Sequence, residues 1–343
     1  MAPSNVRLNP LGGAIFISVV LLVFFYVFGF PTMFPEERVS MRELLSASIV
    51  LARRGGDRVL AIRRDDTLDT KKKGETKEGA NEYVSQGDMK SHEQIYYGLK
   101  KLFPKMNVVS EEHEKKPPSF SSIPDVDLHL QEVLAGVQED QSIPISQITV
   151  WIDPLDATQE YTEMKDKDGS DMLHYVTTMV CVAVDGQPTI GVIHKPFAND
   201  DKGETSWAWV GHGKSGNLQN GAPSSVGEKR IIVSRSHAGT VKEAAQESLS
   251  DVKITPAGGA GYKTLEVVKG NQDAYIHTTL IKKWDICAGN AIIKALNGKM
   301  TTLNGGNIDY SQGHVPKNEG GLLATLYGHD LYLNKLGKLK TQL

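Results

Sequence analysis

Cysteine, net charge and glycosylation signals are all scarce in this chain of 343 residues. Its two cysteines, Cys181 and Cys287, lie inside apolar segments, so we expect buried free thiols and no disulfide framework. The formal net charge is −3, and the basic run Lys71-Lys72-Lys73 has Glu75 and Glu78 close by. No large basic patch stands out, which argues against a nucleic-acid polymer as partner. The absence of any Asn-x-Ser/Thr acceptor means that glycosylation does not help to place the chain.

One long segment lacks charge altogether, from Leu11 to Phe30. About 20 apolar residues are enough to cross a hydrocarbon core of about 30 Å as a helix. A cleaved signal peptide would have a shorter apolar region followed by small residues, whereas bulky residues follow here, from Phe30 to Pro35. We therefore predict an uncleaved transmembrane anchor. Arg7 before it and Arg38 and Arg42 after it leave its orientation undecided.

An apolar segment leads into an acidic motif in the middle of the chain. Residues 147–152, Gln-Ile-Thr-Val-Trp-Ile, are largely β-branched or apolar, which predicts a core strand. Asp153 follows directly, and Pro154 is expected to end the ladder because it has no N–H donor. Asp153 and Asp156 have the spacing of neighbours on a helical turn, and such close carboxylates repel each other without a cation. The motif therefore indicates cation binding, although Asp and Thr here could instead cap a helix.

Two further acidic motifs could complete such a site. Residues 108–110 read as a short strand ending in Glu111-Glu112, and Trp284-Asp285 opens a helix predicted to run through Leu296. No thiolate or histidine cluster accompanies these carboxylates. Oxygen ligands alone suit Mg²⁺, which commonly leaves part of its coordination shell to substrate phosphate oxygens. A site of this kind at a strand end would hydrolyse phosphate esters.

The motifs Asp153-Pro154-Leu155-Asp156-Ala157-Thr158 and Trp284-Asp285-Ile286-Cys287-Ala288 resemble the signature of the inositol-monophosphatase-like superfamily. The resemblance runs from about Glu36 to about Gly328. It implies a Mg²⁺-dependent, lithium-sensitive phosphatase. One position departs from the usual pattern, because most members have Gly where this chain has Ala157. The alanine is the variant associated with Golgi-resident bisphosphate nucleotidases of the superfamily.

Two other segments are similar to those bisphosphate nucleotidases. Residues 234–237, Ser-Arg-Ser-His, resemble a nucleotide-contacting Ser-x-x-His turn, and residues 258–263 resemble a Gly-Ala-Gly-x-Lys loop. Consecutive glycines allow close backbone approach to a ligand, and a helix N-terminus favours anions. The residues expected to bind adenosine 3′,5′-bisphosphate (PAP) are Ser234, His237, Gly259 and Lys263. His237 could instead be a structural cap or core histidine.

The resemblance also implies a location and a purpose. The chain would be a single-pass type II protein of the Golgi membrane with its catalytic part in the lumen. There it would hydrolyse PAP, a product of sulfotransferases, to AMP and so support glycosaminoglycan sulfation.

Carried over residue by residue, the resemblance implies two or three Mg²⁺ ions. The expected ligands are four carboxylates and one backbone carbonyl, those of Glu111, Asp153, Leu155, Asp156 and Asp285. Asp88 and Thr158 would orient the attacking water or accept its proton, so no phosphoenzyme is needed. Asp88 could also be the N-cap of the helix that follows it.

The alternation of helices and strands predicts a layered α/β architecture, which the resemblance sharpens to an α-β-α-β-α sandwich. We expect a short tail (1–10), the anchor (11–30), a metal-binding α+β subdomain (31–200) and an α/β nucleotide-binding subdomain (201–343). An insertion near 113–146 has no role that we can assign. The site would lie between the two subdomains.

Some local features can also be predicted. Residues 40–43, Ser-Met-Arg-Glu, read as a capping box that opens a helix through about Arg54, which Gly55-Gly56 would weaken. The charged stretch Asp65–Asn81 reads as a mobile loop, which the resemblance would place over the site, although it could instead be a solvated flap without a chemical role. Tyr175–His194 is expected to form a hairpin.

Two other functions stay open. An inositol or sugar monophosphatase, including one that acts on phosphorylated sugars of lumenal glycans, could have the same metal core. A membrane-anchored, non-catalytic scaffold is a second alternative. The nucleotide-like motifs argue against the first, and the complete carboxylate set argues against the second. The expected partners are a small nucleotide bisphosphate and a membrane, and a homodimer is left open.

Overall fold

The structure is a computed structural model that describes residues 9–28, 36–65, 69–75, 81–113, 118–219, 229–235 and 251–336. The chain divides into two compact units, Met1–Arg38 and Val39–Leu343. His237, one of the expected nucleotide contacts, lies outside the described residues.

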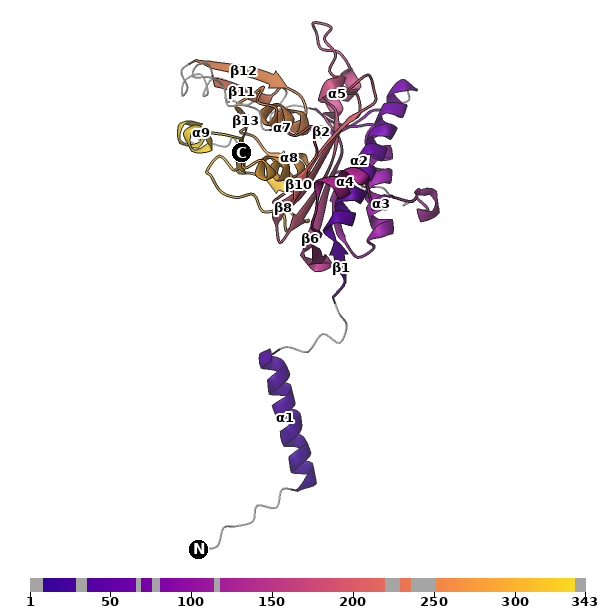
Figure 1. The fold of residues 1–343 in the computed structure, drawn as a ribbon, viewed down its shortest axis with the longest axis vertical. Helices are drawn as coiled ribbons and strands as arrows, with labels where there is room; N and C mark the ends of the chain where they lie inside the picture. Colours follow the sequence, from indigo (N-terminus) through magenta and orange to yellow (C-terminus); the bar gives the residue numbers. More distant parts are fainter. Residues whose placement is uncertain are drawn as a thin grey trace. The chain divides into compact units, whose positions relative to one another are not determined.

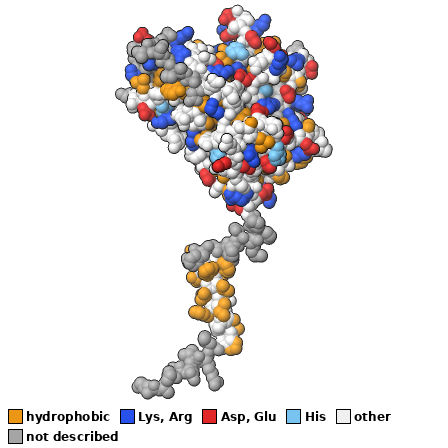
Figure 2. Space-filling view, in the orientation of Figure 1, with side chains coloured by type: hydrophobic (Ala, Val, Ile, Leu, Met, Phe, Trp, Pro, Cys, Tyr) orange, Lys and Arg blue, Asp and Glu red, His pale blue; other side chains and the backbone are white. Residues whose placement is uncertain are grey.

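The first unit contains helix α1, Pro10–Phe28 (Figure 1). Most of its large apolar side chains are exposed, from 48% for Val20 and Leu21 to 90% for Tyr26, and Figure 2 shows apolar side chains along the helix surface. Within the described part of the chain, no helix has the length and apolar character needed to cross a membrane. The segment predicted as an anchor is thus confirmed as a helix over most of its length but not as a membrane span.

The second unit is built around two sheets (Figure 1). The first has the strand order β10-β9-β8-β7-β6-β4, with β6 parallel to β4 and the other neighbours antiparallel. Its strands are β4 (Asn107–Ser110), β6 (Ile148–Asp156), β7 (Thr177–Val184), β8 (Gln187–Lys195), β9 (Glu204–Trp209) and β10 (Gly213–Lys214). The expected hairpin within Tyr175–His194 is confirmed as β7 and β8.

The second sheet has the order β12-β11-β13-β17-β15. Its strands are β11 (Lys229–Ser234), β12 (Val252–Ala257), β13 (Ala274–His277), β15 (Lys299–Thr301) and β17 (Leu322–Thr325). β11 is parallel to both β12 and β13, whereas β17 is antiparallel to its neighbours. Three two-stranded pairs complete the described strands: β1 (Arg38–Ser40) with β5 (Ser142–Pro144), β2 (Lys71–Glu75) with β3 (Asn81–Val84), and β14 (Ile281–Lys282) with β16 (Lys317–Asn318).

Helices separate and cover these sheets, as the ribbon shows (Figure 1). Helices α2 (Met41–Arg64) and α3 (Gln86–Leu102) pack on one face of the first sheet. Helices α7 (Ala260–Val268) and α8 (Lys283–Ala295) lie between the sheets, and α9 (His329–Leu336) packs on the far face of the second. The smaller helices are α4 (Gln131–Gly136) and α5 (Thr158–Glu163). The predicted layered α/β architecture is therefore confirmed.

Strand β6 contributes side chains to the apolar cores on both faces of the first sheet. Its residues from Ile148 to Leu155 are all buried, because helices cover both faces of the sheet. Side chains alternate along a strand, so Trp151 joins the core shared with α8 while Val150 and Ile152 join the core under α2 and α3. The apolar run before Asp153 thus fixes the strand deep inside the unit.

Helix α2 begins as predicted but does not weaken at its two glycines. The Ser40 side chain accepts a hydrogen bond from Glu43 N at 3.1 Å, and the helix then runs on to Arg64. A Cβ at Gly55 would lie 2.5 Å from Ser91 Oγ on α3, and one at Gly56 would meet the His194 ring. The predicted end near Arg54 is wrong because the two glycines let α2 approach its neighbours closely.

Two other local predictions need correction. The stretch expected to be a loop, Asp65–Asn81, contains β2 and runs into β3, which pair as an antiparallel hairpin. β6 is not ended by Pro154, since pairing with β7 resumes at Asp156 opposite Thr177 after a register shift. Asp153 and Asp156 therefore lie on an irregular strand end rather than on a helical turn.

The expectation of free thiols is wrong. Cys181 on β7 and Cys287 on α8 form a disulfide, although both lie in apolar surroundings as predicted. Because the two cysteines are 106 residues apart, no local sequence pattern predicts their pairing.

Candidate metal centre

Two acidic residues are brought together by a parallel strand pair. β4 and β6 are in register from Asn107 opposite Thr149 to Ser110 opposite Ile152, so Glu111 and Asp153 follow at the same edge of the sheet. The Glu111 N–H donates to the Ile152 carbonyl at 3.2 Å, which extends the pairing by one residue. Carboxyl ends of parallel strands are the usual location of ligand sites in α/β proteins.

The third carboxylate comes from another layer. Asp285 lies in the first turn of α8, where its Oδ2 accepts a hydrogen bond from Lys282 N at 3.1 Å. Glu111, Asp153 and Asp285 each offer an oxygen within 4.8 Å of the others'. Three of the five predicted metal ligands therefore form one compact cluster.

Asp156, a fourth predicted ligand, instead connects the end of the first sheet to helix α7. Its Oδ1 accepts from Ala260 N at 3.0 Å, and its Oδ2 accepts from Gly261 N at 2.8 Å and from Thr177 Oγ1 at 3.1 Å. The two N–H groups belong to the first turn of α7, where donors lack intrahelical partners and the helix dipole favours negative charge. Its charge is still felt at the cluster, because it helps to raise the pKa of Asp285.

The fifth predicted ligand, the Leu155 carbonyl, adjoins the two predicted catalytic residues. Thr158 Oγ1 lies 3.0 Å from the Leu155 oxygen and 3.0 Å from Asp88 Oδ1. The alternative in which Asp88 is an N-cap is wrong: Ser85 caps α3, and Asp88 accepts from Ser85 N at 2.7 Å and Ser85 Oγ at 2.6 Å. Asp88 is thus fixed with one oxygen toward Thr158.

Burial and mutual repulsion raise the proton affinity of this cluster. Burial first, and neighbouring acidic charges after it, raise the pKa of Glu111 to about 8 and that of Asp285 to about 7. The same causes raise the pKa of Asp153 well above its usual range. Burial also raises the pKa of Asp88 to about 6. The protein thus gathers more negative charge here than its own cations neutralise.

Lys73 partly compensates that charge and was missed in the sequence. Its ammonium lies 3.3 Å from Glu111 Oε1 and contacts Glu112 Oε1. Burial alone would lower the pKa of Lys73, but the charges of Glu111 and Glu112 raise it overall. Nothing distinguished Lys73 from Lys71 and Lys72 in the sequence, because the hairpin that carries it to the cluster was interpreted as a loop.

The residues expected to contact a nucleotide lie at the ends of the parallel strands in the second sheet. Ser234, the last residue of β11, is opposite Ala257, the last residue of β12, and is 7% exposed. Gly259 follows with a φ of +62°, and a Cβ there would lie 2.7 Å from the Tyr175 carbonyl and 3.0 Å from Asp156 Oδ2. Glycine is needed at this position for both reasons.

Lys263 is buried beneath this loop. Only 3% of the residue is exposed, and its ammonium donates to the Gly259 carbonyl at 2.5 Å and lies 3.4 Å from the Ala257 carbonyl. In this position it holds the shape of the loop, and its direct contact with a substrate stays a prediction.

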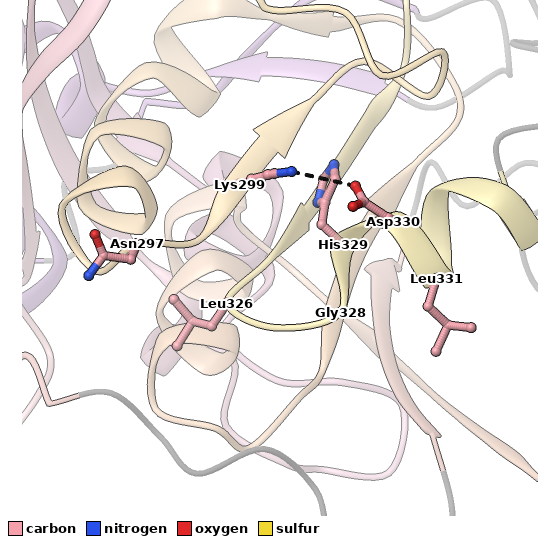
Figure 3. A pocket seen from close by; sticks show the side chains of 7 residues that line it. All are labelled: Asn297, Lys299, Leu326, Gly328, His329, Asp330 and Leu331. Atoms are coloured by element: carbon pink, nitrogen blue, oxygen red, sulfur yellow. Dashed lines mark hydrogen bonds and ion pairs between the residues drawn. The ribbon is translucent and has the colours of Figure 1, made fainter.

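A separate pocket of about 250 Å³ lies beside α9, and Figure 3 shows its lining. Both ring nitrogens of His329 are engaged, with Thr301 Oγ1 at 2.9 Å and Thr325 Oγ1 at 3.0 Å. Lys299 pairs with Asp330 at 3.4 Å. None of the predicted site residues lines this pocket, so it has no part in the carboxylate site.

The donor set fits a hard divalent cation. Three clustered carboxylates with raised pKa values offer oxygen ligands and too little compensating positive charge, which are the conditions that favour Mg²⁺ over softer metals.

The chain is similar in sequence to known phosphatases. The sequence profile described as "Inositol monophosphatase family" matches residues 40–336. A curated relative from Danio rerio named "Inositol monophosphatase 3" is 46% identical, and the match covers 95% of this chain and 94% of the relative. One from Homo sapiens named "Golgi-resident adenosine 3′,5′-bisphosphate 3′-phosphatase" is 42% identical, with 99% of each chain covered.

Solved structures share the fold. The extragenic suppressor protein suhB from Bartonella henselae has a TM-score of 0.62 at 20% identity, over 87% of this chain and 98% of that one. CysQ from Bacteroides thetaiotaomicron has a TM-score of 0.58 at 19% identity, over 84% of this chain and 98% of that one.

The carboxylate cluster predicts an unusual dependence of stability on pH. Glu111, Asp153 and Asp285 have higher pKa values in the folded state than in the unfolded state, so the folded chain binds more protons as they titrate. Its free energy of unfolding therefore decreases as pH rises. Without Mg²⁺, we expect a loss of about 1–2 kcal/mol between about pH 7 and 8.5, measured by denaturant unfolding. The buried side chains of His92 and His194 do not titrate between pH 7 and 8.5 in the folded chain, because burial lowers their pKa values to about 4.

The variant Asp153→Asn should flatten this slope and raise stability at pH 8.5 when no metal is present, because it removes one of the repelling charges. Asp330→Asn is the matched control, since its side chain is 78% exposed and pairs with Lys299. Equal slopes in the two variants would contradict the electrostatic interpretation.

Proposed function

The chain belongs to the inositol monophosphatase family, and we propose that this phosphoric monoester hydrolase removes the 3′-phosphate of PAP to give AMP. Relatives about 42% identical over the full length carry names that state this activity. The proposed purpose is removal of a sulfotransferase product, in support of glycosaminoglycan sulfation.

One contact carries the proposal, the hydrogen bonds of Asp156 to the first turn of α7. They bring the loop after β12 against the strand end that bears Asp153. A phosphate ester held at the carboxylates would therefore have its leaving group beside Gly259 and Ser234, at the end of β11. A glycine loop, which lets a ligand approach the backbone closely, is suited to a large phosphorylated leaving group such as a nucleotide.

The residues that would hold Mg²⁺ are Glu111, Asp153, Asp285, Asp156 and the Leu155 carbonyl, and we propose two or three ions. When bound, the metal would supply an activated water, charge neutralisation of the phosphate and stabilisation of the leaving oxygen. Asp156 can join only by sharing oxygens that already accept hydrogen bonds from α7.

The chain's own contribution to proton transfer comes from Thr158 and Asp88. With a pKa of about 6, the Asp88 carboxylate is mostly ionised at neutral pH and can accept the Thr158 proton at 3.0 Å. The Thr158 oxygen is then free to accept a proton from the attacking water. Asp88 is held in this orientation by Ser85, so the pair is organised before substrate binds.

Hydrolysis of an inositol phosphate is a second candidate. It is favoured by the name of the Danio rerio relative, which is 46% identical. The same carboxylates would bind the phosphate in both reactions. The two functions therefore differ only in the residues beside the leaving group.

Removal of the Thr158 hydroxyl tests the proton-transfer pair. Thr158→Ala should lower kcat by on the order of 10²-fold with little change in KM, because the hydroxyl is used in the chemical step. Thr158→Ser retains the hydroxyl and should stay within a few-fold of wild type. A change in KM alone, or equal rates for the Ala and Ser variants, would contradict this role.

Comparison of substrates tests the function itself. Phosphate release should be measured with Mg²⁺ for PAP, inositol 1-phosphate and AMP, and kcat/KM for PAP should be at least about tenfold higher than for the other two. Asp153→Asn should lose nearly all turnover, whereas Asp330→Asn should not. A preference for inositol 1-phosphate would favour the second candidate, and no turnover on any of the three would reject both.

We also propose that the protein resides at the Golgi membrane with Val39–Leu343 on the lumenal side and the uncharged helix α1 as its attachment. The names of the relatives support the organelle. The Cys181–Cys287 disulfide supports the lumenal location of Val39–Leu343, because disulfides persist in oxidising compartments. In sealed Golgi vesicles, added protease should leave Val39–Leu343 intact until detergent is present, and digestion without detergent would reject this orientation.

A further inference from the structure

The disulfide joins two layers of the fold at one close contact. Cys181 lies in the middle of β7 and Cys287 in the first half of α8, with their Cα atoms 5.7 Å apart. They are 1% and 0% exposed. Gly191, the partner of Cys181 on β8, faces the helix so closely that a Cβ would overlap the Ala288 carbonyl. The backbone of α8 therefore lies directly on the sheet at the disulfide.

Each cysteine is close to a carboxylate of the cluster, Cys287 along its own helix and Cys181 across the sheet. Cys287 is two residues after Asp285 on the same helix. Cys181 is opposite Trp151 on β6, two residues before Asp153. The disulfide thus joins α8, which carries Asp285, covalently to β7, and β7 is hydrogen-bonded to β6, the strand that leads to Asp153.

The three acids are not held together equally. Glu111 and Asp153 follow strands β4 and β6, which are hydrogen-bonded to each other, so their separation is set by the sheet. Asp285 comes from a helix that meets the sheet through side-chain packing. Repulsion among the clustered charges acts on all three, and the contact between α8 and the sheet is the one that it would open.

We propose that Cys181 and Cys287 are positioning residues for the metal site: their disulfide holds Asp285 beside Glu111 and Asp153 while no cation is bound. The cation then finds its ligands already assembled, so its affinity is higher than it would be without the disulfide. This inference concerns metal binding and does not depend on which phosphate ester is the substrate.

The first test is for the disulfide itself. Full-length protein made in the secretory pathway of eukaryotic cells and extracted with detergent should be unfolded without reductant and titrated for thiols. We expect no reactive thiol before reduction and two after it, since the chain has two cysteines. Two reactive thiols before reduction would overturn the proposal.

The second test separates positioning from simple stabilisation. In the double variant Cys181→Ala/Cys287→Ala, the Mg²⁺ dissociation constant measured by calorimetry should rise about tenfold, with kcat at saturating Mg²⁺ changed less than about threefold. Amide hydrogen exchange in the first turns of α8 should be faster in the metal-free variant than in metal-free wild type. The same shifts are expected of wild type kept reduced, which serves if the variant does not fold.

Ile292→Val is the matched control, because Ile292 lies on α8 and is fully buried. It should lower the unfolding temperature equally with and without Mg²⁺ and leave the Mg²⁺ dissociation constant unchanged. If the disulfide variant behaves like this control, with unaltered Mg²⁺ affinity and unaltered exchange at α8, the disulfide only stabilises the fold and the proposal is wrong.

Discussion

The hydrogen bonds between Asp156 and the first turn of α7 are the interaction on which the two-sheet arrangement of the site depends. They join a residue at the end of β6 to backbone N–H groups of α7, a helix that lies between the two sheets, at 3.0 and 2.8 Å. For this contact the chain must turn sharply at Gly259, whose φ is +62°. The carboxylate gains donors that are otherwise unpaired at a helix start, and the helix gains a partner for its dipole.

Excess negative charge is the second constraint, and it follows from the first. Bringing the layers together places Asp285 beside Glu111 and Asp153, where partial or complete burial and the neighbouring acidic charges raise the pKa of each. Lys73 on the β2–β3 hairpin offsets part of the charge. A bound cation would offset more, and the disulfide opposes the remaining repulsion mechanically. The same unfavourable electrostatics that the fold must resist would favour a hard cation at this site.

Patterns within a few residues were predictive where local chemistry decides the structure. The apolar run before Asp153 is a buried strand, the N-cap Ser40 begins a helix, and Asp285 lies in the first turn of α8. The predictions failed where distant residues decide. The helix continues through Gly55-Gly56 because α3 and β8 pack against the glycines, and Pro154 does not end β6 because pairing with β7 resumes beyond it.

The sequence by itself determined which groups could do the chemistry: a set of carboxylates without soft ligands, a threonine after Asp156, and a glycine-rich turn before Lys263. Only the tertiary structure decided how they are used. It placed Asp156 on the N-terminus of α7, turned Lys263 into the loop above it, brought Lys73 to Glu111 and joined Cys181 to Cys287. The reason is that side-chain type is a local property of the chain, whereas burial, charge repulsion and bond formation depend on which distant segments the fold brings into contact.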